Sequence, residues 1–179
     1  MSWFEELKSY FPEEEMKSKA QLDCLLKDRG DIYYKDEGPS HIMMYAAFPD
    51  FIYIDFLWVS EKSRGKGIGR KVIETLKAKN KPIIIEVEPI DEREPDTARR
   101  LRFYNKLNFK LAESIDYLFQ AFLTESEIKL DLMYWSEGDI SEKAIFEYMN
   151  TVYQEIHTYK VEEFYGVIPK SVEKVISFI

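Results

Sequence analysis

The chain has 179 residues, of which 45% are hydrophobic and 32% charged, a balance typical of a folded domain with a substantial core. Its net charge of −8 argues against general binding to nucleic acid or to acidic membranes. One cysteine, Cys24, rules out an intramolecular disulfide, and two histidines distant in sequence, His41 and His157, argue against a metal centre. With no signal-peptide pattern and no apolar run long enough to span a bilayer, we expect a cytoplasmic protein.

The N-terminal segment predicts a pair of helices that ends before the first strand. Pro12 stands where the first turn of a helix tolerates proline, and the acidic run 13–15 suits the positive end of the helix dipole. Gly30 is expected to end the second helix in the left-handed conformation.

A meander of short strands is predicted next, because aromatic and β-branched residues alternate between turn signals. The turn signals are Gly38-Pro39 and Pro49-Asp50. The predicted strands cover 31–35, 41–48 and 51–59. A glycine-rich loop follows the third strand, and an amphipathic helix begins within it at Ile68.

The remaining chain alternates strands and helices. Strands are predicted at 83–88, 117–123 and 128–134, and helices at 97–107, from Ser141 onward and around 172–179. Asn108 is expected to end the first of these helices in the left-handed region. This order predicts a mixed α/β sheet flanked by helices. We expect a domain over 1–135 and a helical C-terminal extension over 136–179 that packs on it.

The glycine-rich loop carries the strongest functional signal. Gly65, Gly67 and Gly69 let backbone N–H groups approach an anion without an intervening Cβ atom. The helix that begins there adds unpaired donors, and the basic residues Arg64, Lys66 and Arg70 surround the loop in an otherwise acidic chain. Strand, glycine loop and helix together predict a cradle for a pyrophosphate.

Two common phosphate-binding motifs do not fit this loop. A Walker loop would close on Gly-Lys-Ser/Thr, whereas Gly69 is followed by Arg70 and Lys71. The dinucleotide fingerprint would place its third glycine at residue 70 or 72, which are Arg70 and Val72. A flexible connector without a ligand remains the alternative, because short glycine motifs recur by chance.

The segment from Leu57 to Gly69 resembles the acetyl-coenzyme A motif of the GNAT N-acetyltransferase family, Arg/Gln-x-x-Gly-x-Gly/Ala after a strand. Arg64, Gly67 and Gly69 fill the defining positions. Downstream, the segment 102–109 is similar to the second signature of the family, Phe-Tyr-x-x-x-Gly-Phe, with Asn108 in place of the glycine. The two motifs occur in the expected order and are separated by a predicted strand.

The resemblance implies the GNAT fold, a mostly antiparallel twisted sheet, with acetyl-CoA as co-substrate and no metal. It implies that the acetyl group passes directly to a primary amine in a ternary complex. Backbone groups of Leu57, Trp58 and Val59 would pair with the pantetheine arm, and those near Trp58 and Val59 would steady the oxyanion. The residues implied for the pyrophosphate loop are Arg64, Gly65, Lys66, Gly67, Ile68, Gly69 and Arg70.

The catalytic residues are expected on the elements that border this slot. Tyr104 matches the family tyrosine that protonates the departing thiolate. Glu86, Asp55 and Glu88 are the candidate bases for the incoming ammonium, because they lie on the two strands that should flank the thioester. The same carboxylates could instead pair with arginines of the helix at 97–107 and be structural.

Other functions remain open at this point. A GNAT-shaped acyl-CoA sensor or interaction module without turnover is the main alternative, and an unrelated nucleotide-binding protein is the third. The resemblance implies an amine acceptor, either a small molecule or a peptide, but fold does not determine which. A homodimer is expected by analogy with the family.

Overall fold

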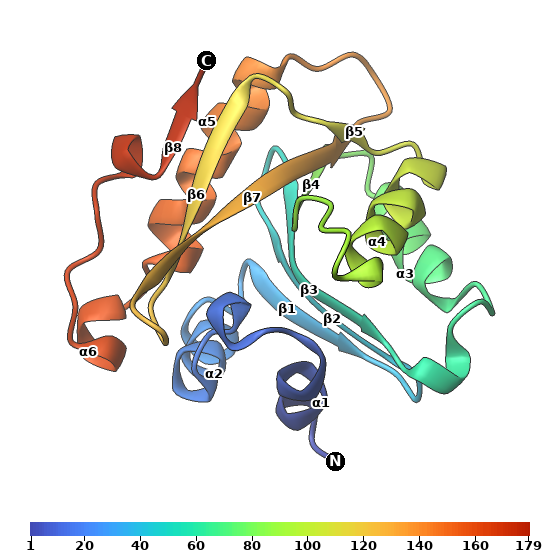
Figure 1. Ribbon diagram of the computed structural model, residues 1–179, viewed down its shortest axis with the longest axis horizontal. Coiled ribbons are helices and arrows are strands. Elements are labelled where there is room, and N and C mark those ends of the chain that lie inside the picture. The colour runs from blue at the N-terminus through green and yellow to red at the C-terminus, as the bar shows by residue number, and fades with distance from the viewer.

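A twisted sheet of eight strands organises the chain in the computed structural model, which describes residues 1–179 (Figure 1). The strand order is β1-β2-β3-β4-β7-β6-β8, and the short β5 pairs with β7. The strands are β1 (Tyr33–Glu37), β2 (His41–Ala47), β3 (Ile52–Val59), β4 (Ile83–Val87), β5 (Lys110–Leu111), β6 (Ile115–Ala121), β7 (Ser126–Trp135) and β8 (Ile176–Phe178). Only β3 and β4 run parallel, so the predicted mixed, mostly antiparallel sheet is confirmed.

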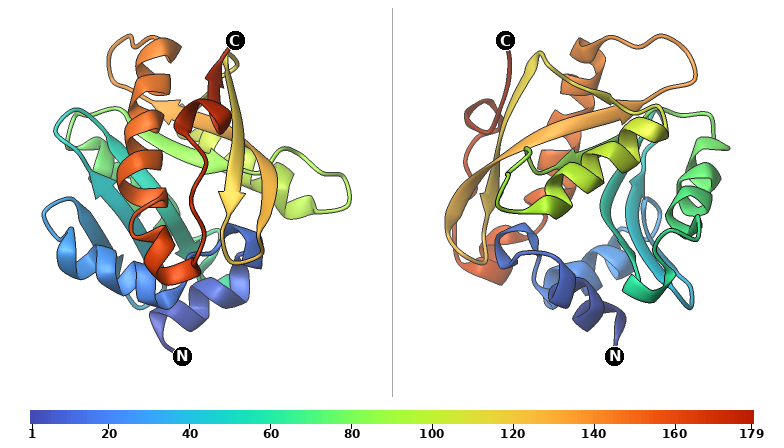
Figure 2. Two further views of the ribbon diagram at one scale, coloured as in Figure 1. Left: turned by 90° about the vertical axis from the view of Figure 1, so that its left-hand side faces the viewer. Right: turned by 45° about the vertical axis from the view of Figure 1, so that its right-hand side comes forward.

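The six α-helices are α1 (Trp3–Tyr10), α2 (Lys19–Asp28), α3 (Ile68–Lys77), α4 (Pro95–Lys106), α5 (Glu142–Val152) and α6 (Val161–Tyr165). Five of them cover the two faces of the sheet, and α6 packs beside α2 (Figure 2). Helices α3 and α4 share a core of 13 buried residues with one face. Helices α1, α2 and α5 pack into the larger core of 27 buried residues on the other. No helix is long and apolar enough to cross a membrane.

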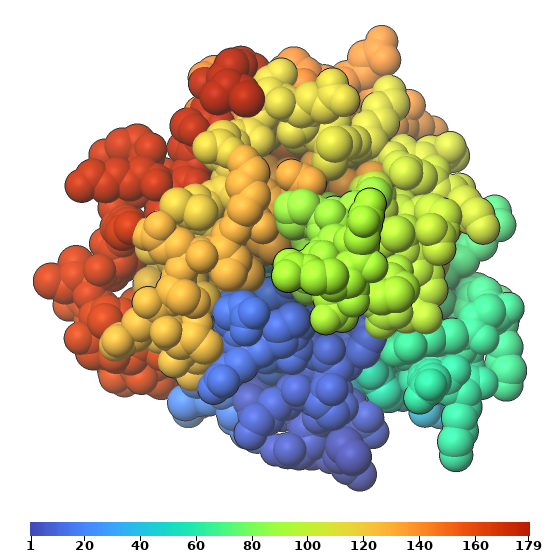
Figure 3. Space-filling model, in the orientation of Figure 1, coloured from blue at the N-terminus to red at the C-terminus, as the bar shows by residue number.

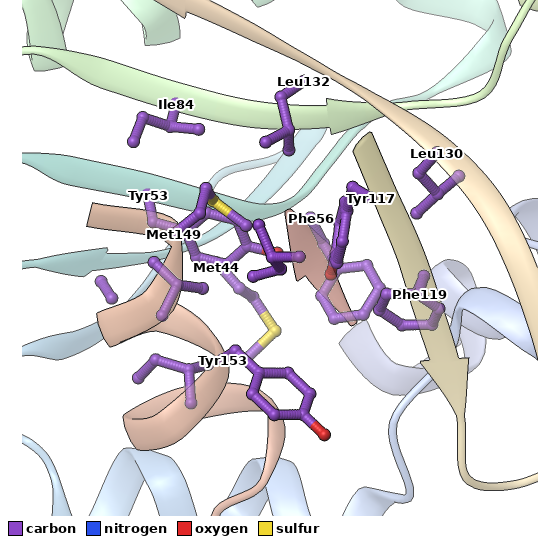
Figure 4. Packing of buried hydrophobic residues seen from close by; sticks show 14 of the residues in the cluster. Met44, Tyr53, Phe56, Ile84, Tyr117, Phe119, Leu130, Leu132, Met149 and Tyr153 are labelled. Atoms are coloured by element: carbon purple, nitrogen blue, oxygen red, sulfur yellow. The ribbon is translucent and has the colours of Figure 1, made fainter. Parts of the chain in front are cut away.

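The larger core joins the C-terminal segment to the first half of the chain. Met149 and Tyr153 belong to the same buried cluster as Tyr53 and Phe56 of β3, part of which is seen in the close view (Figure 4). The predicted inner face of the C-terminal helix is confirmed, because Ile145, Met149, Val152 and Ile156 are all fully buried. The Ser141 hydroxyl accepts the N–H of Ala144 at 3.2 Å, as a helix cap does.

The predicted helix around 172–179 is wrong. Only a single 3₁₀ turn, Val172–Lys174, forms there, and the chain then pairs as β8 with β6. So short an apolar segment fits a helical period and a strand period equally well. The otherwise unpaired edge of β6 selects the strand, because it offers backbone partners that a helix would leave unused.

The N-terminal prediction also needs correction. The acidic residues Glu13–Glu15 form only a 3₁₀ turn, and α2 begins at Lys19, where the Ser18 hydroxyl accepts the N–H of Gln21. Gly30 is not in the left-handed region, because α2 ends through bonds from the N–H groups of Ile32 and Tyr33 to the Arg29 carbonyl. Asn108, by contrast, has φ of 65°, as predicted.

Candidate functional site

The parallel strands β3 and β4 separate halfway along their length. They pair only from Ile52 opposite Ile83 to Ile54 opposite Ile85. Directly afterwards β3 has a bulge, because Ile54 and Phe56 oppose consecutive residues of β2 and leave Asp55 as the extra residue. A bulge bends a strand and increases its twist. Beyond Ile54, β3 therefore keeps its β2 partner and presents a free edge towards β4.

A cavity of about 680 Å³ opens where the two strands part. Its walls come from β3, β4, the loop before α3, the N-terminal part of α3, the length of α4 and the segment that follows α1. On the surface, this N-terminal segment, the segment before α4 and the β6–β7 hairpin meet on one face (Figure 3). The cavity thus joins both predicted motifs, which lie about forty residues apart in the chain.

The glycine loop has the geometry of an anion cradle. Gly65 and Gly67 have φ of 79° and 78°, and a Cβ atom on either would meet nothing within 4 Å. Both therefore present bare backbone to open space. The first hydrogen bond of α3 runs from the Lys71 N–H to the Gly67 carbonyl at 3.0 Å, so the amides of residues 68–70 have no backbone acceptor. Such a group of N–H donors at a helix start attracts phosphate oxygens.

The remaining loop residues divide into fixed and exposed ones. Arg64 is held by a 3.4 Å bond from its Nε to the Val59 carbonyl and lies over the Tyr10 ring, 5.0 Å from the centroid. Gly69 is buried, and a Cβ atom there would lie 3.0 Å from Phe103, so this glycine lets α3 approach α4. Lys66 and Arg70 are exposed, and only Arg70 borders the cavity.

On β3, Leu57 and Val59 border the cavity, whereas the Trp58 side chain packs against the larger core. Four basic residues of α4 complete this end of the cavity: Arg99, Arg100, Arg102 and Lys106. The coenzyme loop predicted from the sequence therefore gathers around one hollow with positive charge at its mouth.

Tyr104 is buried in α4 and borders the cavity. Its hydroxyl has no hydrogen-bond partner in the protein and is not among the fully buried polar atoms, so it opens to the cavity. Burial raises the pKa of the phenol well above its usual range. The hydroxyl therefore keeps its proton at neutral pH and is available as a donor.

Asp55 is fully engaged by neighbouring side chains. Both of its oxygens accept from the Lys17 ammonium, at 2.8 and 2.9 Å, and Oδ2 also accepts from the Tyr33 hydroxyl at 2.6 Å. The Tyr53 hydroxyl lies 3.3 Å from Oδ1. Burial alone would raise the pKa of Asp55, but the Lys17 charge and these hydrogen bonds outweigh it and lower the pKa. A carboxylate so stabilised is a weak proton acceptor.

Glu86 has one engaged oxygen and one free oxygen. Its Oε1 accepts from the Tyr117 hydroxyl at 2.8 Å and lies 2.6 Å from His157 Nε2. Oε2 has no partner in the protein and is not fully buried, and Glu86 borders the cavity. Of the three predicted bases, Glu86 is the one that has an unbonded oxygen at the cavity and makes no ion pair with an arginine of α4.

Glu88 sits farther along at the mouth and belongs to a different group. Its Oε1 lies 3.7 Å from Arg100 Nη1, so Glu88 makes the pairing with an α4 arginine that the sequence left open as an alternative. Glu15 faces the same pair, and burial together with the nearby Glu88 raises its pKa to about 9. Arg100 also donates to the Tyr10 hydroxyl at 3.2 Å. These side chains connect the N-terminal turn to α4.

The sequence reasoning missed the partners of the carboxylates. These partners come from four separate parts of the chain, and no local spacing connects them to residues 55 or 86: Lys17, Tyr33, Tyr117 and His157. One signal was available for His157. It continues the apolar face of α5, where an unpaired imidazole would be costly and therefore requires a partner.

Comparisons with known proteins agree with this geometry. A model of the GNAT acetyltransferase domain matches residues 28–111. A Bacillus subtilis (strain 168) protein, YjbC, which is provisionally named as an acetyltransferase, is 50% identical over 179 residues, covering all of this chain and 93% of its own length.

Solved structures extend the likeness to three dimensions. A Bacteroides thetaiotaomicron protein described as a member of the GNAT family superposes with a TM-score of 0.63 and 26% identity, over 92% of this chain and 90% of its own. Arabidopsis thaliana NAA60, solved with a bisubstrate analogue, shares the fold with a TM-score of 0.54 and 11% identity, over 74% of this chain and 89% of its own. The chain therefore belongs to the GNAT family and is an acyltransferase.

Proposed function

We propose that this protein transfers the acetyl group of acetyl-CoA to a primary amine by direct attack in a ternary complex. The observation that carries the proposal is the cavity between the parted strands, which brings the glycine cradle, the Tyr104 hydroxyl and the free oxygen of Glu86 together. Members of the family use acetyl-CoA, and the cradle fits its pyrophosphate, because Gly65 and Gly67 leave open the space that a Cβ atom would fill.

In this proposal the coenzyme is held by three parts of the site. The amides at the start of α3, from Gly65 to Arg70, hold the pyrophosphate, and the side chains of Arg64 and Lys66 add positive charge. The free edge of β3, from Leu57 to Val59, hydrogen-bonds the extended arm as an added strand would. When bound, the coenzyme supplies an activated acetyl thioester.

Two side chains then move protons. Glu86 accepts a proton from the acceptor ammonium at Oε2, directly or through one water molecule, which leaves the amine nitrogen its lone pair. Tyr104 donates its hydroxyl proton towards the thiolate that leaves, and its raised pKa keeps that proton in place until then. Positioning of the two reactants in one cavity supplies much of the rate.

The acceptor approaches the cavity beside Glu86 of β4, which borders it. The carboxylate of Glu86 favours a cationic amine, either a small molecule or a peptide. A cytoplasmic location is proposed from the sequence, and a homodimer by analogy with the family.

The proposal is tested by thiol release from acetyl-CoA in the presence of spermidine, lysine, kanamycin and an unblocked peptide, each run separately. We expect thiol release that depends on one of these amines, with a matching acetylated product in the mass spectrum. Coenzyme binding without turnover on any of them would favour the sensor alternative. Absence of coenzyme binding would contradict the proposed function altogether.

A further inference from the structure

A buried polar cluster lies beneath the cavity and extends into the C-terminal third of the chain. His157 is 4% exposed, Tyr117 is 1% exposed, and both contact Glu86. Both lie outside residues 28–111, which the family model matches. The proposed reaction assigns no role to these two contacts.

The end of α5 is built to aim His157 at the sheet. The helix continues into a π-helical turn, Tyr153–His157, which closes with a bond from the Thr158 N–H to the Tyr153 carbonyl at 3.0 Å. Turns of this kind are rare and occur often at functional sites. Gln21 of α2 is fully buried and donates to the carbonyls of His157 and Tyr159, at 3.3 and 2.9 Å. This amide ties the turn to α2.

Aromatic rings then fix the plane of the imidazole. Tyr53 and Phe119 meet it edge-on, with centroid separations of 5.5 and 5.4 Å and interplanar angles of 83° and 88°. Figure 4 shows Tyr53, Tyr117 and Phe119 around this part of the core. With its backbone tied by Gln21 and its ring held on two sides, His157 has little freedom to turn away from Glu86.

The contacts of Glu86 indicate which way its carboxylate faces. Both inward contacts converge on Oε1, which leaves Oε2 for the cavity. We assign the imidazole proton to Nε2, because the carboxylate oxygen at 2.6 Å can only accept. The Tyr53 hydroxyl, 3.2 Å from the same nitrogen, donates to Asp55 and offers its lone pair towards Nε2.

We propose that His157 is a positioning residue for Glu86: its Nε2–H and the Tyr117 hydroxyl hold Oε1, so that Oε2 faces the acceptor as a carboxylate. The role as a base rests on the proposed function, but the coupling itself does not. Hydrogen bonds to the charged form favour the carboxylate over the acid. The other titratable groups around the imidazole are Tyr53 and Asp55 of β3, with Lys17 paired to Asp55.

The coupling is tested first without substrate, by NMR of the imidazole N–H protons at one fixed pH. The chain has two histidines, so a His41→Gln variant assigns both signals. We expect His157 to carry its proton on Nε2, and that N–H signal to move clearly upfield in Glu86→Gln, because a neutral amide oxygen accepts a weaker hydrogen bond than a carboxylate. Glu88→Gln, two residues along the same segment, should leave the signal in place. An unchanged Nε2–H signal in Glu86→Gln would overturn the proposal.

A second experiment measures turnover with acetyl-CoA and with whichever of the amines named above gives the fastest wild-type rate. His157→Phe keeps an aromatic ring but no donor, whereas His157→Gln keeps one N–H donor. We expect His157→Phe to lower kcat about tenfold or more, to leave KM for acetyl-CoA unchanged, and to move the acidic limb of the pH profile to higher pH. His157→Gln should restore most of kcat. Near-UV circular dichroism checks that both variants fold.

The two proposals fail in different ways. A wild-type enzyme that acetylates an amine, together with a wild-type rate and pH profile in His157→Phe, would overturn the positioning role and leave the proposed function intact. No acetylation by wild-type protein, with the NMR coupling present, would overturn the proposed function and with it the role of Glu86 as a base.

Discussion

The loop at the start of α3 and the carboxylates beneath the cavity show two ways in which this chain builds a site. The loop is local: Gly65 and Gly67 take the left-handed conformation, and the helix that follows supplies the donors. The carboxylates are not local, because Asp55 and Glu86 take their character from Lys17, Tyr117 and His157.

The two parts of the site differ in which groups give a residue its chemical role. A backbone cradle binds its ligand through N–H groups. The glycines determine its function, because they leave those N–H groups accessible. A carboxylate is a base or a structural anion depending on what surrounds it. Asp55 and Glu86 sit on adjacent strands, yet the first is neutralised by an ammonium and the second retains a free oxygen.

The largest expected effect concerns Asp55, the carboxylate that is paired with Lys17. Asp55→Asn would leave the Lys17 ammonium, 6% exposed, without its charged partner. Loss of one member of a buried ion pair costs about 3–5 kcal/mol in the free energy of unfolding. Urea denaturation measures this cost. Asp23→Asn is the control, because it breaks an exposed pair with Lys19 that is worth less than about 1 kcal/mol. Equal losses in both variants would contradict a structural role for the Asp55–Lys17 ion pair.

The second prediction concerns the donor that opens to the cavity. Tyr104→Phe keeps the ring packed and removes only the hydroxyl. We expect kcat to fall about 100-fold, equivalent to about 2.7 kcal/mol of transition-state stabilisation, with acetyl-CoA affinity unchanged. Tyr34→Phe is the matched control, because that hydroxyl bonds to the Asp31 carbonyl at the surface. Wild-type turnover in Tyr104→Phe would remove the tyrosine from the reaction.

The third prediction separates backbone conformation from ligand binding at the loop. Gly67→Ala forces a side chain into the left-handed region, at a cost of about 1–2 kcal/mol, and places its Cβ atom in the cradle. Gly166→Ala meets the same strain at φ of 69° at the end of α6, away from the cavity. We expect similar thermal destabilisation in both variants, but loss of acetyl-CoA binding by calorimetry only in Gly67→Ala. Equal affinities would contradict the cradle.

The last prediction concerns the pH dependence of stability, through a group at the mouth of the cavity. Glu15 has a pKa of about 9 in the folded protein against 4.5 as its ordinary value. Between pH 4.5 and 9 the folded protein keeps a proton on Glu15 that the unfolded chain loses. The stabilisation of the folded state by this proton is therefore complete below pH 4.5 and declines as the pH rises towards 9. The slope is at most about 1.4 kcal/mol per pH unit. In Glu15→Gln, urea denaturation at several pH values should show a flatter profile, and an unchanged slope would contradict the assignment.

Local sequence was sufficient for the elements whose signals are local. The glycine loop, the left-handed Asn108 and the Ser141 cap all depend on a few neighbouring residues, and the structure has them as expected. The C-terminal strand β8 was missed because its partner β6 lies about sixty residues away. His157 was missed for the same reason, because it lies 71 residues from Glu86, and the π-helical turn and Gln21 bring its ring there. Long-range pairing, and not propensity, decided each of these.

The central claim is that the loop between β3 and α3 binds the coenzyme of an acetyltransferase. Calorimetric titration of the wild-type protein with acetyl-CoA, coenzyme A and ATP tests it most directly. Micromolar binding of both coenzymes with no binding of ATP is the predicted result. Tighter binding of ATP, or no binding of either coenzyme, would contradict the claim.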